Sequence, residues 1–144
     1  MDIVLDSYIN GTFYGWSGST LFKLGNNSFW IQTRYAYNYH YAYRPSAKII
    51  QDAGAYFLEV ENVGERVEVK RVTDIIESQI KGTFKGWKSK TQFELTNGQT
   101  WEQTEYNYMY HYAYRPTVLI YNTQSGYRIS VEGTKETTTV KRIK

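Results

Sequence analysis

The chain of 144 residues carries one tyrosine-rich segment twice. Residues 35–45 read YAYNYHYAYRP, and residues 106–116, which lie 71 positions later, read YNYMYHYAYRP. The same offset aligns residues 9–73 with residues 80–144 without a gap, and 30 of the 65 aligned positions are identical. Similarity of this extent indicates a tandem duplication rather than chance. Whatever fold the chain adopts must therefore close within a repeat of about 70 residues.

The duplication predicts two domains, residues 1–72 and 73–144. The segment before the aligned region also repeats, since residues 4–7 resemble residues 75–78. No Gly/Ser-rich or Pro-rich spacer separates the copies, so we expect the two domains to abut closely. Domains of this size are near the lower limit for an independent hydrophobic core. Each copy therefore has to use its aromatic residues efficiently.

Within each copy the pattern is that of short β-strands. Residues 9–14 alternate between two sets of side chains, as expected for a half-buried strand, and Asn97-Gly98 is a strong hairpin signal. Turns are expected at Gly54 and at Ser125-Gly126. Only residues 2–8 and 74–80 are compatible with a helical turn, and both are too short to be stable alone. The later strands of the two copies are expected at residues 47–51, 56–61 and 66–72, and at residues 118–122, 127–132 and 137–143.

About five or six short strands joined by tight turns favour a small closed or half-open barrel, because closure removes exposed sheet edges. We therefore predict an all-β protein made of two tandem SH3-like barrels. The order of hairpin, hairpin, aromatic connection and hairpin is similar to that of SH3-like modules. An OB-like barrel is the alternative, and a meander sandwich shared between the copies stays open.

Three consecutive motifs also resemble a known type of domain. Ile-x-Gly-x-Phe-x-Gly-Trp is followed by Thr-x-Phe-x-Leu-x-Asn-Gly-x-x-Trp and then by the tyrosine tract, from Ile80 to Pro116. With a different turn sequence the same order runs from Ile9 to Pro45. This arrangement resembles a small family of bacterial domains and covers nearly all of both copies. The resemblance implies a compact β-barrel module and no particular activity.

If the tyrosine tract is extended, its five tyrosines lie on one face and its small and polar residues lie on the other. We expect most rings to pack across strands and against the other copy, because a small domain otherwise fills its core poorly. The alternative is a solvent-facing platform, since tyrosine gives a large contact area with few rotatable bonds. The candidate ligand-binding residues are Trp16, Tyr37, Tyr39, Tyr41 and Arg44 in the first copy, and Trp87, Tyr108, Tyr110, Tyr112 and Arg115 in the second.

The only two prolines follow Arg44 and Arg115 and fix the end of each tract. We expect each arginine to stack on a tyrosine ring, with recognition of a carboxylate or a phosphate as the alternative. The four tryptophans are expected mainly in the core. Trp16 and Trp87, which each follow a glycine and precede a turn, are the pair expected to be more exposed.

Residue content argues against catalysis and metal binding. The chain has no cysteine and one histidine per copy, His40 and His111, which leaves each copy without a metal-ligand set. It also lacks a phosphate loop and the motifs of known nucleophiles. We therefore expect that the protein is not an enzyme and that it binds neither a metal nor a cofactor. Without a signal-peptide pattern or an apolar run of about 18 residues, we expect a soluble cytoplasmic protein without membrane contact.

The sequence favours a binding module whose two copies engage an extended protein or peptide partner. Binding of single-stranded nucleic acid is the alternative, with tyrosines stacked on bases and Arg44, Arg115, Lys141 and Arg142 near phosphates. The net charge of +3 gives that alternative little support. A third possibility is a structural module that oligomerises.

Overall fold

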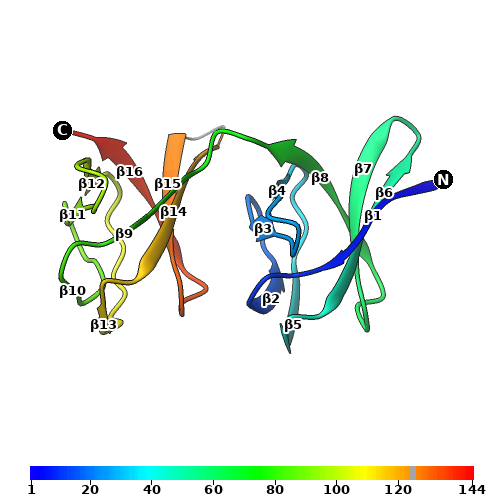
Figure 1. Ribbon diagram of the computed structural model, residues 1–144, viewed down its shortest axis with the longest axis horizontal. Helices are drawn as coiled ribbons and strands as arrows, with labels where there is room; N and C mark the ends of the chain where they lie inside the picture. Colours follow the sequence, from blue (N-terminus) through cyan, green and yellow to red (C-terminus); the bar gives the residue numbers. More distant parts are fainter. Residues whose placement is uncertain (124–125) are drawn as a thin grey trace. The chain divides into compact units, whose positions relative to one another are not determined.

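The computed structural model describes residues 1–123 and 126–144, and the chain divides into two compact units, Met1–Thr73 and Asp74–Lys144 (Figure 1). The described residues form sixteen strands and no helix, which confirms the all-β prediction. Accordingly, none of the described segments is a helix that could cross a membrane. The turn expected at Ser125-Gly126 lies partly outside the described residues.

Six strands of the first unit form one curved sheet in the order β1-β6-β7-β8-β4-β3 (Figure 1). The two remaining strands, β2 and β5, pair with each other. All pairings are antiparallel. The strands are β1 (Asp2–Tyr8), β2 (Thr12–Trp16), β3 (Leu21–Lys23), β4 (Phe29–Gln32), β5 (Asn38–Tyr43), β6 (Ser46–Asp52), β7 (Ala55–Val60) and β8 (Arg66–Val72).

The same order recurs in the second unit as β9-β14-β15-β16-β12-β11, and β10 pairs with β13. The tyrosine tract contributes a shorter regular strand here than in the first unit. The strands are β9 (Ile76–Gln79), β10 (Thr83–Phe84), β11 (Gln92–Glu94), β12 (Thr100–Gln103), β13 (Ala113–Tyr114), β14 (Thr117–Thr123), β15 (Gly126–Val131) and β16 (Thr137–Arg142).

The two edge strands of each large sheet meet at one end. Ile9, after β1, forms an antiparallel bridge with Leu24, after β3, and the amide of Gly25 donates to the carbonyl of Tyr8 at 2.9 Å. Ile80 and Leu95 form the equivalent bridge in the second unit. These contacts curl each sheet into a half-barrel and leave less of its edges open to pairing with another chain.

The strands expected from residue 47 onward in the first copy, and from residue 118 onward in the second, are confirmed within one or two residues at their described ends. The helical turns proposed for residues 2–8 and 74–80 are wrong. The first of these segments is β1, which pairs with β6 over its length, and the second contains β9, which pairs with β14. Ladder hydrogen bonds to a neighbouring strand satisfy backbone groups that a helix of this length leaves largely unpaired.

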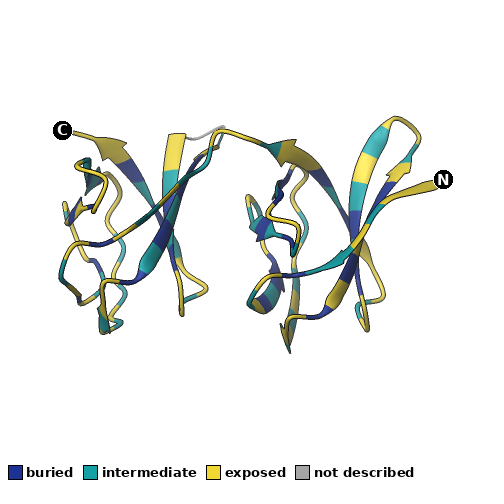
Figure 2. Ribbon diagram, in the orientation of Figure 1, coloured by how far each residue is buried: buried dark blue, intermediate teal, exposed yellow. Residues whose placement is uncertain are grey.

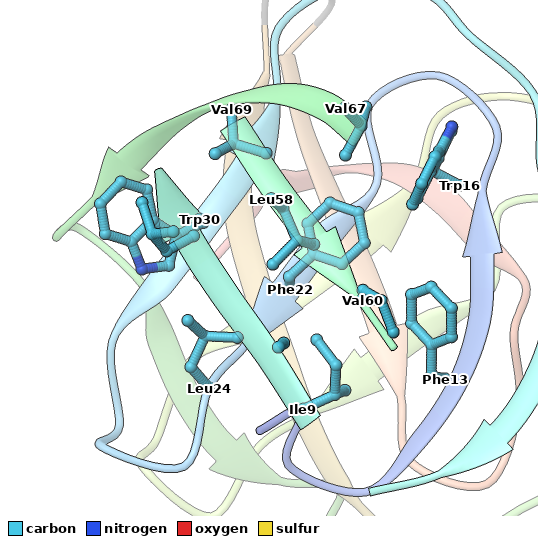
Figure 3. Close-up of a cluster of buried hydrophobic side chains, with 12 residues drawn as sticks. Ile9, Phe13, Trp16, Phe22, Leu24, Trp30, Leu58, Val60, Val67 and Val69 are labelled. Carbon is cyan, nitrogen blue, oxygen red and sulfur yellow. The ribbon is translucent and has the colours of Figure 1, made fainter. Parts of the chain in front are cut away.

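Each unit has its own hydrophobic core, and Figure 3 shows that of the first. Leu24, Ile49 and Leu58 have no exposed surface. Along β6 and β7 buried positions alternate mainly with more exposed ones, so one face of the sheet covers the core and the other meets solvent (Figure 2). The second core is built from the equivalent strands, with Val118, Ile120 and Ile129 fully buried.

Trp16 and Trp87 lie in these cores, each only 2 % exposed, which corrects the expectation that they form the more exposed pair. The physical reason in the first unit lies at Gly15, whose φ of +91° interrupts the extended conformation of β2 where its pairing with β5 shifts register. A left-handed residue within a strand changes which face the following side chain occupies. Phe13 and Trp16 therefore both turn inward and meet edge to face, with 6.3 Å between ring centroids (Figure 3).

Candidate functional site: the tyrosine faces

All ten tyrosines of the two tracts are exposed. Their exposed fractions range from 56 % at Tyr39 to 80 % at Tyr35 in the first unit, and from 61 % at Tyr112 to 79 % at Tyr106 in the second. The expectation that most of these rings pack in the protein is therefore wrong. Each unit instead presents one solvent-facing set of rings, called here its tyrosine face: Tyr35, Tyr37, Tyr39, Tyr41 and Tyr43 in the first unit, and Tyr106, Tyr108, Tyr110, Tyr112 and Tyr114 in the second.

The residues between the tyrosines face the core. Ala36 and Ala42 pack against the first core, and the ring of His40 lies 6.3 Å from that of Phe13. In the second unit Met109 packs against the core, and the His111 ring lies 6.5 Å from the Phe84 ring. This arrangement follows the two-residue period of an extended chain, with its small and polar face turned inward. Both histidines therefore act as packing groups.

A glycine in the neighbouring strand lets the tract approach this closely. Gly15 has φ +91°, and a Cβ at this position would overlap the carbonyl oxygen of Asn38. Gly86, with φ +98°, stands in the same relation to the carbonyl of Met109. Because only glycine fits both the conformation and the space, the tract lies tightly on the unit beneath it. So little room remains that the large rings point outward.

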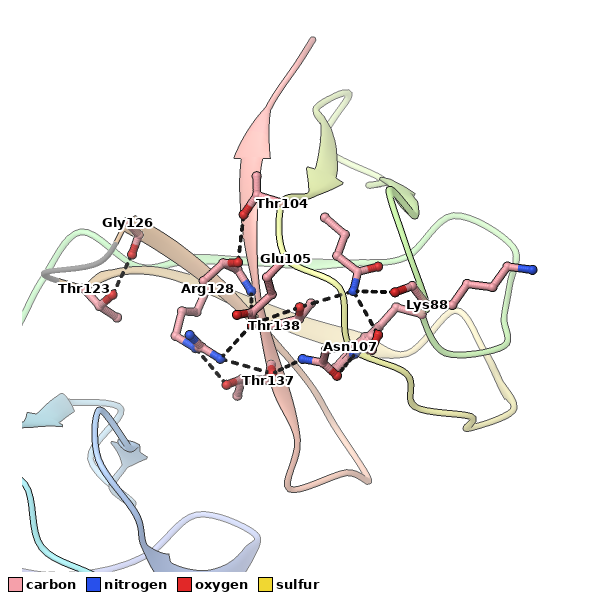
Figure 4. Close-up of polar contacts among 12 residues, drawn as sticks. Lys88, Thr104, Glu105, Asn107, Thr123, Gly126, Arg128, Thr137 and Thr138 are labelled. Atoms are coloured by element: carbon pink, nitrogen blue, oxygen red, sulfur yellow. Dashed lines mark hydrogen bonds and ion pairs between the residues drawn. The ribbon is translucent and has the colours of Figure 1, made fainter.

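Buried glutamines hold the start of each tract. The side-chain amide of Gln32 donates to the carbonyl oxygens of Arg34 at 2.9 Å and Ala36 at 3.0 Å. Gln103 donates in the same way to Asn107 at 3.0 Å and to Lys88 at 3.2 Å (Figure 4). Sequence reasoning assigned these glutamines no role. Their identity in the two copies was the available signal.

The beginning of the second tract is held by a further polar network (Figure 4). One carboxylate oxygen of Glu105 accepts from the amide of Thr139 at 3.2 Å and lies 3.4 Å from Arg128 Nη2. The Nε of Arg128 in turn donates to the hydroxyl of Thr137 at 2.9 Å. Fixed backbone and side-chain partners of this kind preorganise the surface that precedes the tyrosines.

One ring outside the tract extends the first tyrosine face. Tyr14 on β2 meets Tyr41 edge to face, with ring centroids 5.8 Å apart. The equivalent residue of the second unit is Lys85, so the two faces differ in chemistry. Tyr14 is not among the candidates predicted from the sequence, although the alternation of residues 9–14 places it on the face opposite Phe13.

The arginine that ends each tract has different surroundings in the two units. Both arginines have φ +50° and precede a buried proline. Arg44 stacks on the ring of Tyr8, with 4.6 Å from Cζ to the ring centroid, so stacking on a tyrosine is confirmed for this unit. The ring belongs to β1 and not to the tract. Arg115 has Gln79 at the position of Tyr8 and lines a pocket instead.

The candidate residues thus fall into three groups. The tyrosines Tyr37, Tyr39, Tyr41, Tyr108, Tyr110 and Tyr112 lie on the two tyrosine faces, and the two arginines lie at the ends of those faces. Trp16 and Trp87 lie beneath, where their rings support the tract without reaching solvent. Among the described residues no group of three or more His, Cys, Asp or Glu side chains is placed to hold a metal ion.

Comparison of the chain with models of protein families, with curated proteins and with solved structures gave no match. What the tyrosine faces do must therefore be inferred from the residues of this chain.

Proposed function

We propose that the chain is a non-enzymatic binding module whose two tyrosine faces engage an extended protein or peptide partner. The observation that carries this proposal is the exposure of all ten tract tyrosines beside small residues that face the core. Contiguous exposed aromatic surface is uncommon on proteins that lack partners and marks interaction sites. Tyrosine suits such a surface, because it contributes contact area and a hydroxyl group at low entropic cost.

We propose further that each unit is a small SH3-like barrel. The strand order of the six-stranded sheets and the meeting of their edges at Ile9–Leu24 and Ile80–Leu95 support a closed or nearly closed sheet. Small barrels of this kind present aromatic grooves to extended peptides. An OB-like closure remains the alternative, and it would leave the tyrosine faces unchanged.

The spacing of the rings supports an extended partner. Tyr39, Tyr41 and Tyr43 alternate along β5 and are exposed. Alternate residues of a strand are about 6.6 Å apart, which is close to twice the contact distance of two apolar groups. A flat or slender side chain therefore fits between successive rings. An extended peptide repeats its side chains at the same interval and can fill several gaps in register.

In the first unit, charge favours a peptide over a nucleic acid. In the first unit Arg44 is engaged with Tyr8, and Arg34 lies 3.6 Å from the Glu68 carboxylate. That unit has seven Lys or Arg and seven Asp or Glu residues. A strand of nucleic acid needs cations that follow its phosphates as well as rings that stack on its bases. The first tyrosine face has the rings, but the two arginines beside it already contact Tyr8 and Glu68.

The experiment is selection of binders from a phage-displayed library of random linear peptides, followed by titration of the selected peptides. We expect binding to the wild-type chain and its loss in Tyr39→Ser with Tyr110→Ser. The thermal unfolding midpoint of the variant should stay within a few degrees of wild type, because exposed positions change stability by only about 0.5 kcal/mol. Tyr37→Ser with Tyr108→Ser, which lie outside regular strands, gives an independent second variant.

The matched control is Ile3→Ser, which removes exposed apolar surface from β1 and leaves the tyrosines intact. Peptide binding that survives both tyrosine double variants would overturn the proposal. So would binding of a labelled oligothymidylate that falls steeply between low and moderate salt, which is the signature of phosphate contacts. Self-association of the wild-type chain that the same variants abolish would instead favour the structural, oligomerising module.

A further inference from the structure

The second unit contains a pocket of about 450 Å³ at the end of its tyrosine face. Its lining includes two cationic residues, Lys81 and Arg115, and two residues with hydroxyl groups, Thr96 and Tyr114. Leu95, which is 3 % exposed, also borders it. Because Tyr114 is the last ring of the tract, the pocket is continuous with the second tyrosine face.

The first unit shows the same place in a closed form. The Tyr8 ring lies over Gly25 so closely that a Cβ on this glycine would overlap it, and Arg44 covers the ring. The equivalent residues of the second unit are Gln79 and Thr96. Both residues of the Tyr8–Gly25 contact are therefore different in the second unit. The aromatic ring that closes the first unit has no counterpart in the second.

The charges beside the site also differ between the units. Lys81 stands where the first unit has Asn10, and Glu94, whose backbone carbonyl accepts from the Lys81 amide at 2.8 Å, stands where the first unit has Lys23. Lys81 and Arg115 line the pocket, and Glu94 does not. In the part of the chain that the structure describes, no ion pair or side-chain hydrogen bond is formed by Lys81 or Arg115. By contrast, Arg66 and Arg128 each pair with a carboxylate. Two unpaired cations at one pocket attract an anion.

We propose that this pocket binds a carboxylate group of the partner segment, with Arg115 as the main donor and Lys81 as the second cation. The inference rests on the proposed function, because the carboxylate would belong to the peptide that lies on the second tyrosine face. The planar guanidinium matches a carboxylate with two parallel hydrogen bonds. The carboxylate belongs either to an Asp or Glu side chain or to the C-terminus of the partner, and the first unit lacks this site.

Three small probes separate these sources. N-acetylglutamate α-amide has only a side-chain carboxylate, N-acetylglutamine has only an α-carboxylate, and N-acetylglutaminamide has neither. We expect one or both acids to shift the backbone NMR signals of Gly82, Gly98 and Arg115 in the full-length chain. The neutral probe should not shift these signals. The signals of Gly11, Asn27 and Arg44 in the first unit should stay unchanged with every probe.

Exchange of residues between the units supplies matched variants. Gln79→Tyr with Thr96→Gly reproduces the closed contact of the first unit and should abolish the shifts. Lys81→Asn should weaken carboxylate binding by roughly threefold to tenfold, the range for loss of one partly exposed charge contact. The reciprocal triple variant Tyr8→Gln, Gly25→Thr and Asn10→Lys should create the response in the first unit. Thermal unfolding of each variant checks that it is folded.

The two proposals fail in different ways. Equal shifts with the acids and the neutral probe, or acid-dependent shifts that survive closure of the pocket, would overturn the carboxylate site and leave peptide binding to the tyrosines untouched. A carboxylate response without any peptide selected by the tyrosine faces would overturn the proposed function and support the pocket as an independent anion site. Peptides that bind the wild-type chain with Asp, Glu or a free C-terminus at one fixed position, and that lose affinity in Lys81→Asn, would support both.

Discussion

At the scale of single residues, the two units differ in the hydrogen bonding of one buried tryptophan indole N–H. The indole Nε1 of Trp87 donates to the side-chain oxygen of Asn107 at 3.0 Å. The equivalent of Asn107 in the first unit is Ala36, and Trp16 Nε1 has no hydrogen-bond partner among the described residues. A buried donor without a partner costs about 1–3 kcal/mol. The first unit therefore lacks a buried hydrogen bond that the second unit makes.

This difference makes a prediction about stability. Ala36→Asn should place an acceptor beside Trp16 and raise the free energy of unfolding of the first unit by about 1 kcal/mol. Asn107→Ala should remove this hydrogen bond from the second unit and lower its stability by about 1–3 kcal/mol. Urea unfolding followed by tryptophan fluorescence measures both changes. Ala36→Asn that destabilises, together with a neutral Asn107→Ala, would show that this hydrogen bond does not account for the difference.

A second prediction at this scale concerns Tyr121, which is only 1 % exposed. Burial raises its pKa above the ordinary value of 10.0, while the charge of Arg128 and a hydrogen bond with Thr137 act in the opposite direction. Between the ordinary and the raised pKa the unfolded chain loses the proton and the folded chain keeps it. The contribution of protonated Tyr121 to the free energy of unfolding is therefore complete below about pH 10 and is lost as the pH rises through the raised pKa.

Tyr121→Phe should remove this loss of stability at alkaline pH. We expect the wild-type chain to lose more stability than the variant when urea unfolding is compared at about pH 9 and about pH 11. The first unit has Ile50 at the equivalent position and serves as the internal reference. Equal alkaline losses in the wild type and in Tyr121→Phe would exclude Tyr121 as their source.

At the scale of elements, the contact between β2 and β5 decides which side of the tract meets solvent. Gly15→Ala should force the Cβ against the Asn38 carbonyl and separate the two strands. We expect a loss of about 2 kcal/mol or more from the combined steric and conformational cost. Peptide binding to the first tyrosine face should weaken with it. Chemical denaturation and peptide titration measure the two effects.

Gly11 provides the control for this prediction. It also has a positive φ, +93°, but no atom lies within 4 Å of a Cβ built there. Gly11→Ala should therefore cost only the conformational part, about 1 kcal/mol. If the two alanine variants lose equal stability, the close approach of β5 contributes nothing measurable and φ alone explains the glycine.

The same elements show what the sequence could and could not predict. Hairpins such as β6–β7 were predictable, because alternating residues and turn signals coincide there. The two-residue alternation of the tyrosine tract was also predictable, but alternation defines two faces without saying which one is buried. Hydrophobicity assigned the tyrosines to the core, whereas the close approach at Gly15 leaves room only for Ala36, Asn38, His40 and Ala42. That distance depends on tertiary structure.

The position of Trp16 could not be read from the sequence for a related reason. The positive φ of Gly15 interrupts the alternation within β2, and strict periodicity misses it. The different surroundings of the two arginines could have been predicted, since the equivalent positions hold Tyr8 and Gly25 in the first unit but Gln79 and Thr96 in the second. What the sequence could not supply was that Tyr8 and Gly25 touch, which depends on the bridge between Ile9 and Leu24.

At the scale of the whole molecule, each unit has its own core and its own sheets, and every sheet of the described residues lies within one unit. The units are also chemically unequal. The second has ten Lys or Arg and seven Asp or Glu residues, a surplus of three positive charges that the first lacks. Two related but unequal faces on one chain suit a partner with two similar segments, of which one carries the carboxylate.

Two faces on one chain predict a dependence on valency. A divalent probe that joins two copies of a selected peptide through a flexible Gly-Ser linker should bind the full-length chain about a hundredfold more tightly than the single peptide does, once the linker spans both faces. The second binding event is then intramolecular and adds affinity without a new kind of contact. A series of linker lengths, each titrated by calorimetry, locates the span.

Tyr39→Ser and Tyr110→Ser, tested separately, are the decisive controls for valency. Each variant leaves one tyrosine face intact, so it should bind the single peptide through that face and lose the gain from the divalent probe. A gain that survives both variants would come from the linker or from association of two protein chains. An affinity that is independent of valency at every linker length would mean that the two faces act separately, and the duplication would then serve to hold two different ligands rather than one.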